Sequence, residues 1–180
     1  MTVFYTALYH TMIAPNTFMD VDRGYRGIDG RRHVAENFTN YTVFSLWDTF
    51  RALHPLLTIT HRELTADLVE TLSNHYRHGG SLPMWELWGN YTETMIGYPA
   101  APVIVDAILK GIEVDTATAY AAVRHSAMQD HRGLEAYKRL GYVPSDTDPE
   151  SVSKTLEYAY GDWVIAQLAA HLGKQVDYQD

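Results

Sequence analysis

Apolar positions recur with a helical period along much of this 180-residue chain. The clearest segment is 60–78, where apolar side chains return every fourth residue, at Leu64, Leu68, Leu72 and Tyr76. Polar residues fill the positions between them, so the segment predicts an amphipathic helix with one wet face. Thr60 and Glu63 have the spacing of a capping box at its start, and Gly79-Gly80 marks its end.

The segment 151–172 has a different pattern, because apolar residues surround most of the helix, at Val152, Leu156, Ala159, Tyr160, Trp163, Val164, Leu168 and Leu172. This distribution predicts a helix that is buried on several sides. Asp148 and Pro149 suit its N-cap and first position, and Gly173 follows its end.

Further helices are expected at 41–58, about 98–112, 116–130 and 133–140, the last of them ending at Gly141. Strand signals are nearly absent, so the sequence predicts an all-α chain of helical hairpins with long loops. Wetter and drier helices alternate, which suits a two-layer helical toroid, and no fixed repeat favours a regular solenoid. The irregular stretches 13–40 and 79–97 are long loops, where binding sites usually lie.

Composition narrows the function classes. With 46% hydrophobic and 20% charged residues, the chain is typical of one ordinary soluble domain. A net charge of −8 argues against a nucleic-acid partner. No stretch approaches the roughly 20 apolar residues of a membrane span, and the N-terminus lacks the pattern of a signal peptide. The absence of cysteine excludes disulfides and thiolate metal sites.

Metal motifs are incomplete in this sequence. Asp20, Asp22 and Gly24 resemble the start of a calcium loop, but Arg31 stands where an EF-hand needs a bidentate glutamate. We therefore favour a glycine-shaped loop whose acids cap helices or pair with nearby arginines. There is no HExxH motif, and the nine histidines provide no clear zinc site.

Neither the individual histidines nor the known nucleophile motifs indicate a catalytic site. His75 and His78 form an i, i+3 pair at a helix end, where a cation is favourable without a metal. His54 is expected to make a local hydrogen bond rather than to act in catalysis. Neither GxSxG, a phosphate loop nor a dinucleotide loop is present, so serine and phosphate chemistry lack support.

Two tryptophan–acid pairs are the strongest candidates for a binding site. Trp47-Asp48 lies in SLWDTFRALHPL (45–56), and Trp85-Glu86 lies in SLPMWELWGN (81–90). An indole can cover the C–H face of a pyranose, and a carboxylate can accept hydrogen bonds from its hydroxyl groups. For each pair alone, helix-core residues with a capping or arginine-paired acid are the better interpretation.

Glycoside hydrolysis needs an acid and a base, which are usually two carboxyl groups. The candidates in this sequence are Asp48, Glu86, Glu93, Glu157 and Asp162. Their separations cannot be read from the sequence, so their roles stay open at this point.

Three blocks occur here in a particular order: SLWDTFRALHPL, LPMWELWGNYTETMIGYPAAPVIVDA and GYVPSDTDPESVSKTLEYAYGDW. With them the chain resembles the calcium-dependent exo-α-mannosidases of glycoside hydrolase family 92, from about residue 4 to the C-terminus. The resemblance implies an enzyme with a β-sandwich followed by an (α/α)6 catalytic toroid. Residues 1–180 would form one partial domain, the N-terminal part of that toroid.

The resemblance also implies site residues. Trp47 and Asp48 match the motif that points into the mannose pocket, and Trp85, Glu86 and Asn90 match the loop beside it. Glu157, in SVSKTLEYA, is a further candidate contact, whose match to the family pattern is weaker.

The family's acid, base and calcium segments lie later than Asp180, so no catalytic or metal-binding residue is assigned in this chain. The sequence differs from the family pattern at Tyr91, Pro99 and Gly161, where the family usually has Glu, His and Asp.

The resemblance thus predicts a fragment of an inverting exo-α-mannosidase that acts on terminal α-mannosides of glycans and is inactive alone. Calcium would belong to the complete enzyme and not be bound by this fragment, and the family suggests a secreted or periplasmic location. One alternative is a non-catalytic helical module that binds a glycan or protein, or self-associates through exposed helix faces such as 151–172. Another is a different (α/α)6 glycosidase specificity, with glucosides as substrates.

Overall fold

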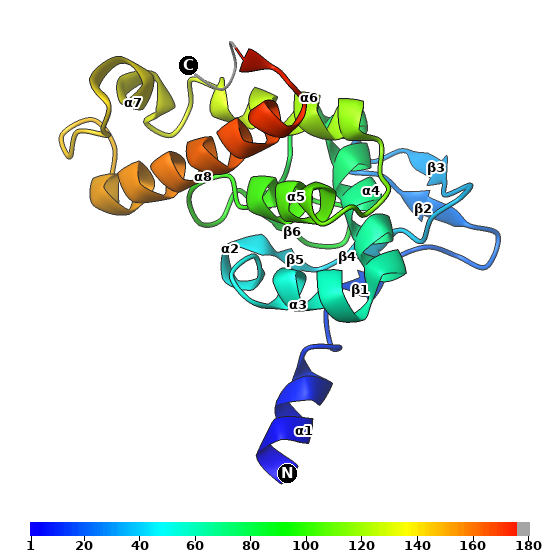
Figure 1. The fold of residues 1–180 in the computed structure, drawn as a ribbon. Helices are drawn as coiled ribbons and strands as arrows, with labels where there is room; N and C mark the ends of the chain where they lie inside the picture. The colour runs from blue at the N-terminus through cyan, green and yellow to red at the C-terminus, as the bar shows by residue number, and fades with distance from the viewer. Residues whose placement is uncertain (176–180) are drawn as a thin grey trace.

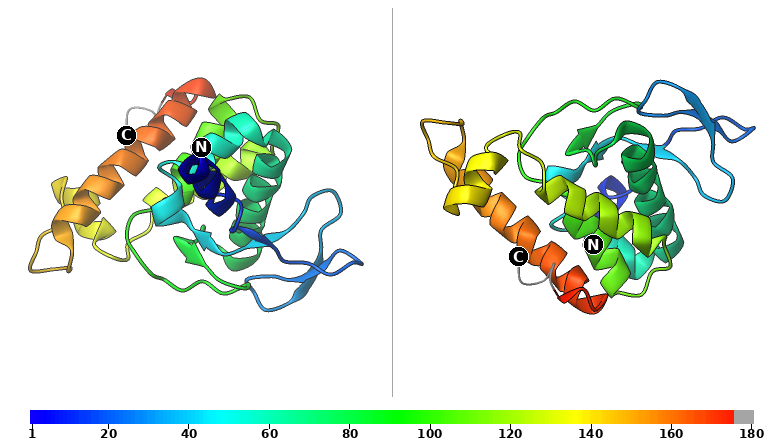
Figure 2. Two further views of the ribbon diagram at one scale, coloured as in Figure 1. Left: turned by 90° about the horizontal axis from the view of Figure 1, so that it is seen from below. Right: turned by 90° about the horizontal axis from the view of Figure 1, so that it is seen from above.

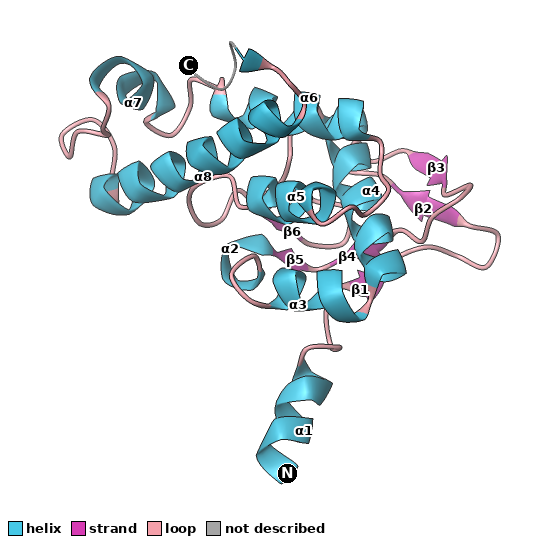
Figure 3. Ribbon diagram, viewed as in Figure 1, coloured by secondary structure: helices cyan, strands magenta, loops and turns pink. Residues whose placement is uncertain are grey.

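The computed structural model describes residues 1–175, which are predominantly helical (Figures 1 and 3). The helices of this part of the chain are α1 (Thr2–His10), α2 (Leu46–Thr49), α3 (Leu53–Thr60), α4 (Arg62–Gly79), α5 (Ala100–Leu109), α6 (Thr116–Ala127), α7 (Leu134–Leu140) and α8 (Ser151–His171). Its strands are β1 (Asn16–Thr17), β2 (Gly24–Arg26), β3 (Arg32–Val34), β4 (Tyr41–Thr42), β5 (Phe44–Ser45) and β6 (Trp85–Glu86).

The strands form three separate two-stranded antiparallel ladders, β1–β4, β2–β3 and β5–β6. Each ladder is only two or three residues long, so together they make no sheet that could carry a core of its own. The β1–β4 and β5–β6 ladders join the two long irregular stretches to residues 41–45, and β2–β3 is a hairpin within the first stretch. The prediction of an all-α chain is wrong to this extent.

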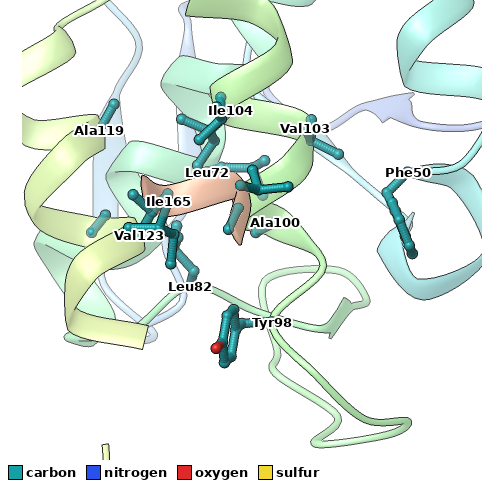
Figure 4. Packing of buried hydrophobic residues seen from close by; sticks show 14 of the residues in the cluster. Phe50, Leu72, Leu82, Tyr98, Ala100, Val103, Ile104, Ala119, Val123 and Ile165 are labelled. Atoms are coloured by element: carbon teal, nitrogen blue, oxygen red, sulfur yellow. The ribbon is translucent and has the colours of Figure 1, made fainter. Parts of the chain in front are cut away.

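Helix α5 is the centre of the packing (Figure 4). It contacts α3, α4, α6 and α8, and nearly every one of its residues is buried. A helix that is surrounded in this way can be apolar on all sides, which explains the sequence AAPVIVDAIL. The core around it includes Leu57, Leu72, Leu82, Ile104, Val123, Ile165 and Leu168.

Helix α4 confirms the amphipathic segment predicted at 60–78. Its buried face carries Leu68 and Leu72, and the chain leaves the helix at Gly80, whose φ of 82° suits glycine. The predicted capping box at its start is wrong: Thr60 ends α3, and its hydroxyl donates to the carbonyl of Leu56.

The helix predicted at 41–58 is wrong over its first part. Residues 41–42 and 44–45 are strands, and only 46–49 and 53–60 are helical. Val43 has a φ of 66° between β4 and β5, and the two strands pair with segments distant in sequence. These long-range pairings override the local helical pattern.

Helix α8 confirms the prediction at 151–172, but its surroundings differ from those expected. It packs on α5 and α6, while four apolar side chains on its other side are exposed, namely Val152, Leu156, Tyr160 and Trp163. The expected burial on several sides is therefore wrong for residues 1–175. Figure 2 shows the ribbon of α8 beside those of α5 and α6 from two further directions. The predicted cap at Asp148 is also wrong, because Glu150 holds the N-cap position and Asp148 pairs with buried Lys154.

The remaining predicted helices are confirmed with small shifts at their ends. Helix α5 spans 100–109, α6 spans 116–127 and α7 spans 134–140, with Gly141 following as predicted. Helix α1 lies apart from the other elements and has no buried residue (Figure 1). Within residues 1–175, no helix is both long enough and apolar enough to cross a membrane.

Candidate functional site

The β5–β6 ladder brings the two tryptophan–acid motifs together. Phe44 pairs with Glu86 and Ser45 pairs with Trp85, although the two motifs are about forty residues apart in sequence. Helix α2 begins directly after Ser45, so Trp47 lies in a short helix beside the second motif. The sequence predicted both motifs, and the structure makes them neighbours.

Asp48 is the solvent-facing acid of the first motif. Its side chain is exposed and accepts a hydrogen bond from the hydroxyl of Ser45. Since the hydroxyl approaches one carboxylate oxygen only, the other oxygen stays available to a ligand.

Trp47 is half-buried, and its ring lies under a positive charge. The guanidinium carbon of Arg51 is 5.4 Å from the Trp47 ring centre and 4.4 Å from that of Phe50. These distances fit cation–π contacts. The indole Nε1 of Trp47 is buried without a hydrogen-bond partner among the described residues.

Glu157 on α8 reaches the same place through Arg51. The two side chains form an ion pair of 2.6 Å, and Arg51 is the more exposed partner. Gly97 lets α8 approach closely, because a Cβ there would lie 3.1 Å from the Glu157 Cβ. Sequence reasoning selected Trp47 and Glu157 but missed Arg51; the i, i+4 spacing of Trp47 and Arg51 within the helical pattern was the available signal.

Glu86 is the buried acid of the second motif, with 0% of its surface exposed. Its carboxylate accepts hydrogen bonds from the Thr42 hydroxyl at 2.9 and 3.0 Å, from the Val43 N–H at 3.1 Å and from the Gly89 N–H at 2.5 Å. Burial raises the pKa of Glu86, and these hydrogen bonds act in the opposite direction. The carboxylate faces backbone and hydroxyl donors, not solvent.

Residues 87–90 form a tight turn after β6, closed by hydrogen bonds in both directions between the backbones of Leu87 and Asn90. Trp88 at its tip is 61% exposed, whereas Trp85 is only half-exposed. Asn90 is exposed, and its amide nitrogen donates to the carbonyls of Leu87 and Trp88. Trp88 was therefore missed by sequence reasoning, which singled out the more covered tryptophan.

The other candidate carboxylates lie elsewhere. Asp162 accepts hydrogen bonds from the hydroxyls of Tyr98 and Tyr137, and burial raises its pKa. Glu93 is exposed, and its backbone carbonyl is held by Arg132 at 2.8 Å. Within residues 1–175, neither acid forms a hydrogen bond or an ion pair with the residues of the two motifs, so only Asp48, Glu86 and Glu157 belong to this site.

The histidines singled out in the sequence lie in buried or ring-stacked positions. His54 is buried, and both of its ring nitrogens lack partners in the described part of the chain, so its expected local hydrogen bond is wrong. Desolvation lowers the pKa of His54, and that of His75, to about 4. His78 stacks on His33 with ring centres 3.8 Å apart.

Metal binding finds no support in this geometry. Asp22 pairs with Arg32 at 2.6 Å, which confirms the arginine-paired interpretation of that loop. Within residues 1–175, no group of three or more His, Cys, Asp or Glu side chains could hold a metal ion. The described residues therefore do not fit calcium.

A cavity of about 510 Å³ lies on another face, between the β2–β3 hairpin and α4. Tyr25, His33, Glu70 and His78 are among its lining residues. It contains none of the residues selected from the two tryptophan–acid motifs, so it is separate from the candidate site.

Comparisons with known proteins support the family resemblance that the order of the three sequence blocks indicated. A family GH92 α-mannosidase of Bacteroides thetaiotaomicron matches with 47% identity and a TM-score of 0.95, covering 98% of this chain and 24% of its own. That enzyme has also been solved with mannoimidazole bound. A family GH92 inverting mannosidase of the same organism matches with 38% identity and a TM-score of 0.89, over 98% of this chain and 25% of its own.

A more distant relative is an uncharacterized secreted glycosidase of Arthroderma benhamiae, which is 27% identical over 96% of this chain and 20% of the fungal protein. The chain thus spans a quarter or less of the length of these relatives. The model of the glycosyl hydrolase family 92 catalytic domain matches residues 1–180. By this match and by its similarity to the two Bacteroides enzymes, the chain belongs to glycosyl hydrolase family 92.

Proposed function

We propose that this chain supplies part of the mannose-binding pocket of an α-mannosidase that removes terminal α-linked mannose from glycans. The observation that carries the proposal is the β5–β6 pairing, which places the two tryptophan–acid motifs side by side. The bound mannoimidazole of the 47% identical relative supports a mannose-like ligand for the family.

Within the pocket, Asp48 would accept hydrogen bonds from sugar hydroxyls, because it is the exposed carboxylate of the two motifs. Trp47 and Trp85 would cover the apolar face of the sugar, and Asn90 would add a polar contact. Glu157 would act at the pocket edge through its ion pair with Arg51.

Glu86 was also selected as a sugar contact. Its complete burial instead supports a role in holding the loop, because each of its oxygens already accepts hydrogen bonds from the protein.

Turnover by an inverting enzyme needs an acid and a base about 6.5–9.5 Å apart on opposite sides of the glycosidic bond. Asp48 is the exposed acid of this site, while Glu157 is neutralised by Arg51. We therefore assign binding to this chain and propose that the acid, the base and any calcium ion come from other segments of the enzyme. The (α/α)6 toroid and a location outside the cytoplasm are parts of the same proposal.

The test is a pair of measurements on the 180-residue chain. Release of mannose from an aryl α-mannoside, with calcium and with chelator, should be undetectable. Binding of methyl α-mannoside, followed by NMR shifts of the tryptophan indoles, should be weak and should be lost in Asp48→Asn.

The matched control is Asp146→Asn, because Asp146 is exposed on a distant loop. Binding that is unaffected by Asp48→Asn would refute the assigned pocket. Calcium-dependent release of mannose would refute the proposal that the acid, the base and calcium come from other segments of the enzyme. A preference for glucosides over mannosides would point to the other glycosidase specificity.

The exposed apolar residues of α8 favour one additional proposal, self-association of the isolated chain. Val152, Leu156, Tyr160 and Trp163 lie on one side of this helix, and all are exposed. Such a continuous apolar surface usually meets a partner.

A further inference from the structure

A pair of stacked histidines joins the β2–β3 hairpin (residues 24–34) to helix α4 (Figure 1). The His33 ring on β3 and the His78 ring near the end of α4 lie face to face, with ring centres 3.8 Å apart and an angle of 6° between their planes. His33 is also held from its own hairpin, because its Nε2 lies 3.0 and 3.2 Å from the two carboxylate oxygens of Asp29. The ring nitrogens of His78, in contrast, form no hydrogen bond or ion pair within residues 1–175.

Few other contacts hold the hairpin on this helix. In the described part of the chain, no hydrogen bond or ion pair joins residues 24–34 to α4. A second close approach is apolar, because a Cβ added to Gly79 would lie 2.5 Å from the Ile28 Cγ2. A two-stranded hairpin with three-residue strands is marginally stable unless it packs against another element. The histidine stack is therefore a principal contact between the hairpin and the helix.

The stack also borders a cavity. His33 and His78 both line the cavity of about 510 Å³ between the hairpin and α4. Tyr25 contributes to its wall from the hairpin, and Ala66 and Asn74 contribute from α4. Because the two walls belong to different elements, release of the hairpin from α4 would open this cavity.

The surroundings of His78 disfavour a positive charge on its ring. Asp29 can neutralise a protonated His33, whereas a proton on His78 would place a second positive charge against the face of the first ring. Burial, the His33 ring and the neighbouring Arg77 hold the pKa of His78 below its ordinary value, and Asp29 acts in the opposite direction. The stacked arrangement therefore favours the neutral form of His78.

The other ionisable groups around the stack do not give His78 a counter-charge. The cavity is lined by four carboxyl groups, those of Glu36, Asp67, Glu70 and Glu113. Within residues 1–175, none of the four forms a hydrogen bond or an ion pair with His78, and Glu70 is paired with Arg77 at 2.6 Å. Tyr25, whose ring centre is 5.7 Å from that of His33, stays uncharged because burial raises the pKa of its phenol.

We propose that the His33–His78 stack is a pH-sensitive contact, which holds the β2–β3 hairpin on α4 at neutral pH and releases it on acidification, opening the cavity between them. A His78 ring that has left the stack takes up a proton more readily than the stacked ring, so acid favours the released state. Release begins as the pH falls below about 6.5, the ordinary pKa of histidine, and its pH dependence ends below the pKa of the stacked His78. The cavity contains no residue of the two tryptophan–acid motifs, so this inference is independent of the proposed sugar ligand.

Amide hydrogen exchange followed by NMR measures the release. The N–H groups of Gly27 and Ala35 donate to the carbonyls of Arg31 and Arg23, within and beside the hairpin. Their protection factors, which are corrected for the intrinsic pH dependence of exchange, should fall by up to about ten-fold between pH 7.5 and 5.5. The buried Leu72 amide of α4 reports global unfolding, and its much slower exchange should show that the hairpin is released locally.

A phenylalanine at position 78 keeps a flat ring against His33 but cannot take up a proton. In His78→Phe, the two hairpin protection factors should therefore agree between pH 7.5 and 5.5 to within about two-fold. His131→Phe makes the same change at an exposed histidine before α7, and this matched control should keep the full pH dependence. His54 and His75 are present in both variants, so their effect on global stability cannot account for the difference.

Thermodynamic linkage provides a second measurement, which leaves both histidines in place. Gly79→Leu puts a side chain where Ile28 packs, and the φ of Gly79 is not positive, so the backbone accepts the change. Because the substitution weakens docking, the pKa of His78, followed through the NMR signals of its ring, should rise towards 6.5. In the wild type this pKa should lie below 6.5.

Three results would overturn the proposal. The first is hairpin protection in the wild type that does not change with pH. The second is an undiminished pH dependence in His78→Phe. The third is a His78 pKa of 6.5 in the wild type that Gly79→Leu leaves unaltered, because the stack and the proton would then be uncoupled. If His78→Phe does not fold, the wild-type exchange and the Gly79→Leu titration decide the matter.

Discussion

Replacement of Gly161 by alanine distinguishes local helix preference from tertiary packing. Gly161 lies inside α8, where an alanine would normally gain about 1 kcal/mol over glycine. In the structure, however, a Cβ at this position would lie 2.2 Å from the Tyr98 Cε2 and 2.7 Å from its Cδ2. Carbon atoms pack at about 3.5–4.0 Å, so the Tyr98 ring would have to move by more than 1 Å.

The Tyr98 ring has little freedom to move. It stacks on Tyr158 with ring centres 5.4 Å apart, and its hydroxyl donates to Asp162. Overpacking of a core costs about 1–3 kcal/mol, and weakening this hydrogen bond costs about 1 kcal/mol more. After subtracting the helix gain of about 1 kcal/mol, we expect Gly161→Ala to destabilise the chain by about 1–3 kcal/mol.

Urea unfolding followed by circular dichroism measures this change. Ser153→Ala, at an exposed position of the same helix, is the control and should stay within about 0.5 kcal/mol of wild type. In a Tyr98→Leu background the clash is removed, so Gly161→Ala should then be neutral or stabilising. A rise in stability on Gly161→Ala in the wild-type background would refute the packing argument.

Three further predictions concern other parts of the chain. His54 has a folded-state pKa of about 4, below its ordinary value, so the unfolded imidazole is protonated first and stability falls as the pH drops from about 6.5 towards 4. At pH 4.5 the loss should reach about 2–3 kcal/mol in urea titrations, and His54→Leu should remove this part of the pH dependence. Asp115→Ala removes the cap that accepts the Thr118 N–H of α6 and should cost about 1–2 kcal/mol in thermal unfolding, whereas exposed Glu113→Ala should change stability little. If the exposed side of α8 drives self-association, light scattering at high concentration should show oligomers that Leu156→Glu disperses, and a wild-type chain that stays monomeric would contradict this proposal.

The helical scaffold could be predicted because its signals are local. In 60–78 an apolar residue recurs at every fourth position, which reflects the period of the helix. Glycines follow the helices because their backbone can adopt positive φ. Neither signal depends on distant residues. The caps predicted at Thr60 and Asp148 are not formed. The Thr60 hydroxyl donates to a carbonyl of its own helix α3, and Asp148 forms an ion pair with Lys154. Short polar side chains have several partners within reach, and only the fold decides among them.

The two tryptophan–acid pairs and their order were visible in the sequence, which was sufficient to predict the family. The tertiary structure decided how the members of each pair differ. Pairing of β5 with β6 buries Glu86 and leaves Asp48 in solvent, although both follow a tryptophan in sequence. Exposure depends on which distant segment packs against a residue, and neighbours in sequence do not encode that directly.

The sequence by itself determined the chemistry available to this protein, namely indoles, carboxylates and amides on a helical chain without cysteine. The tertiary structure alone decided that Trp88 faces solvent, that Arg51 joins Trp47 to Glu157, and that Gly161 makes room for Tyr98. Helix formation is governed by interactions over three or four residues, whereas these contacts join segments up to about a hundred residues apart. Such contacts follow from packing of the whole chain, and they set the geometry of the site.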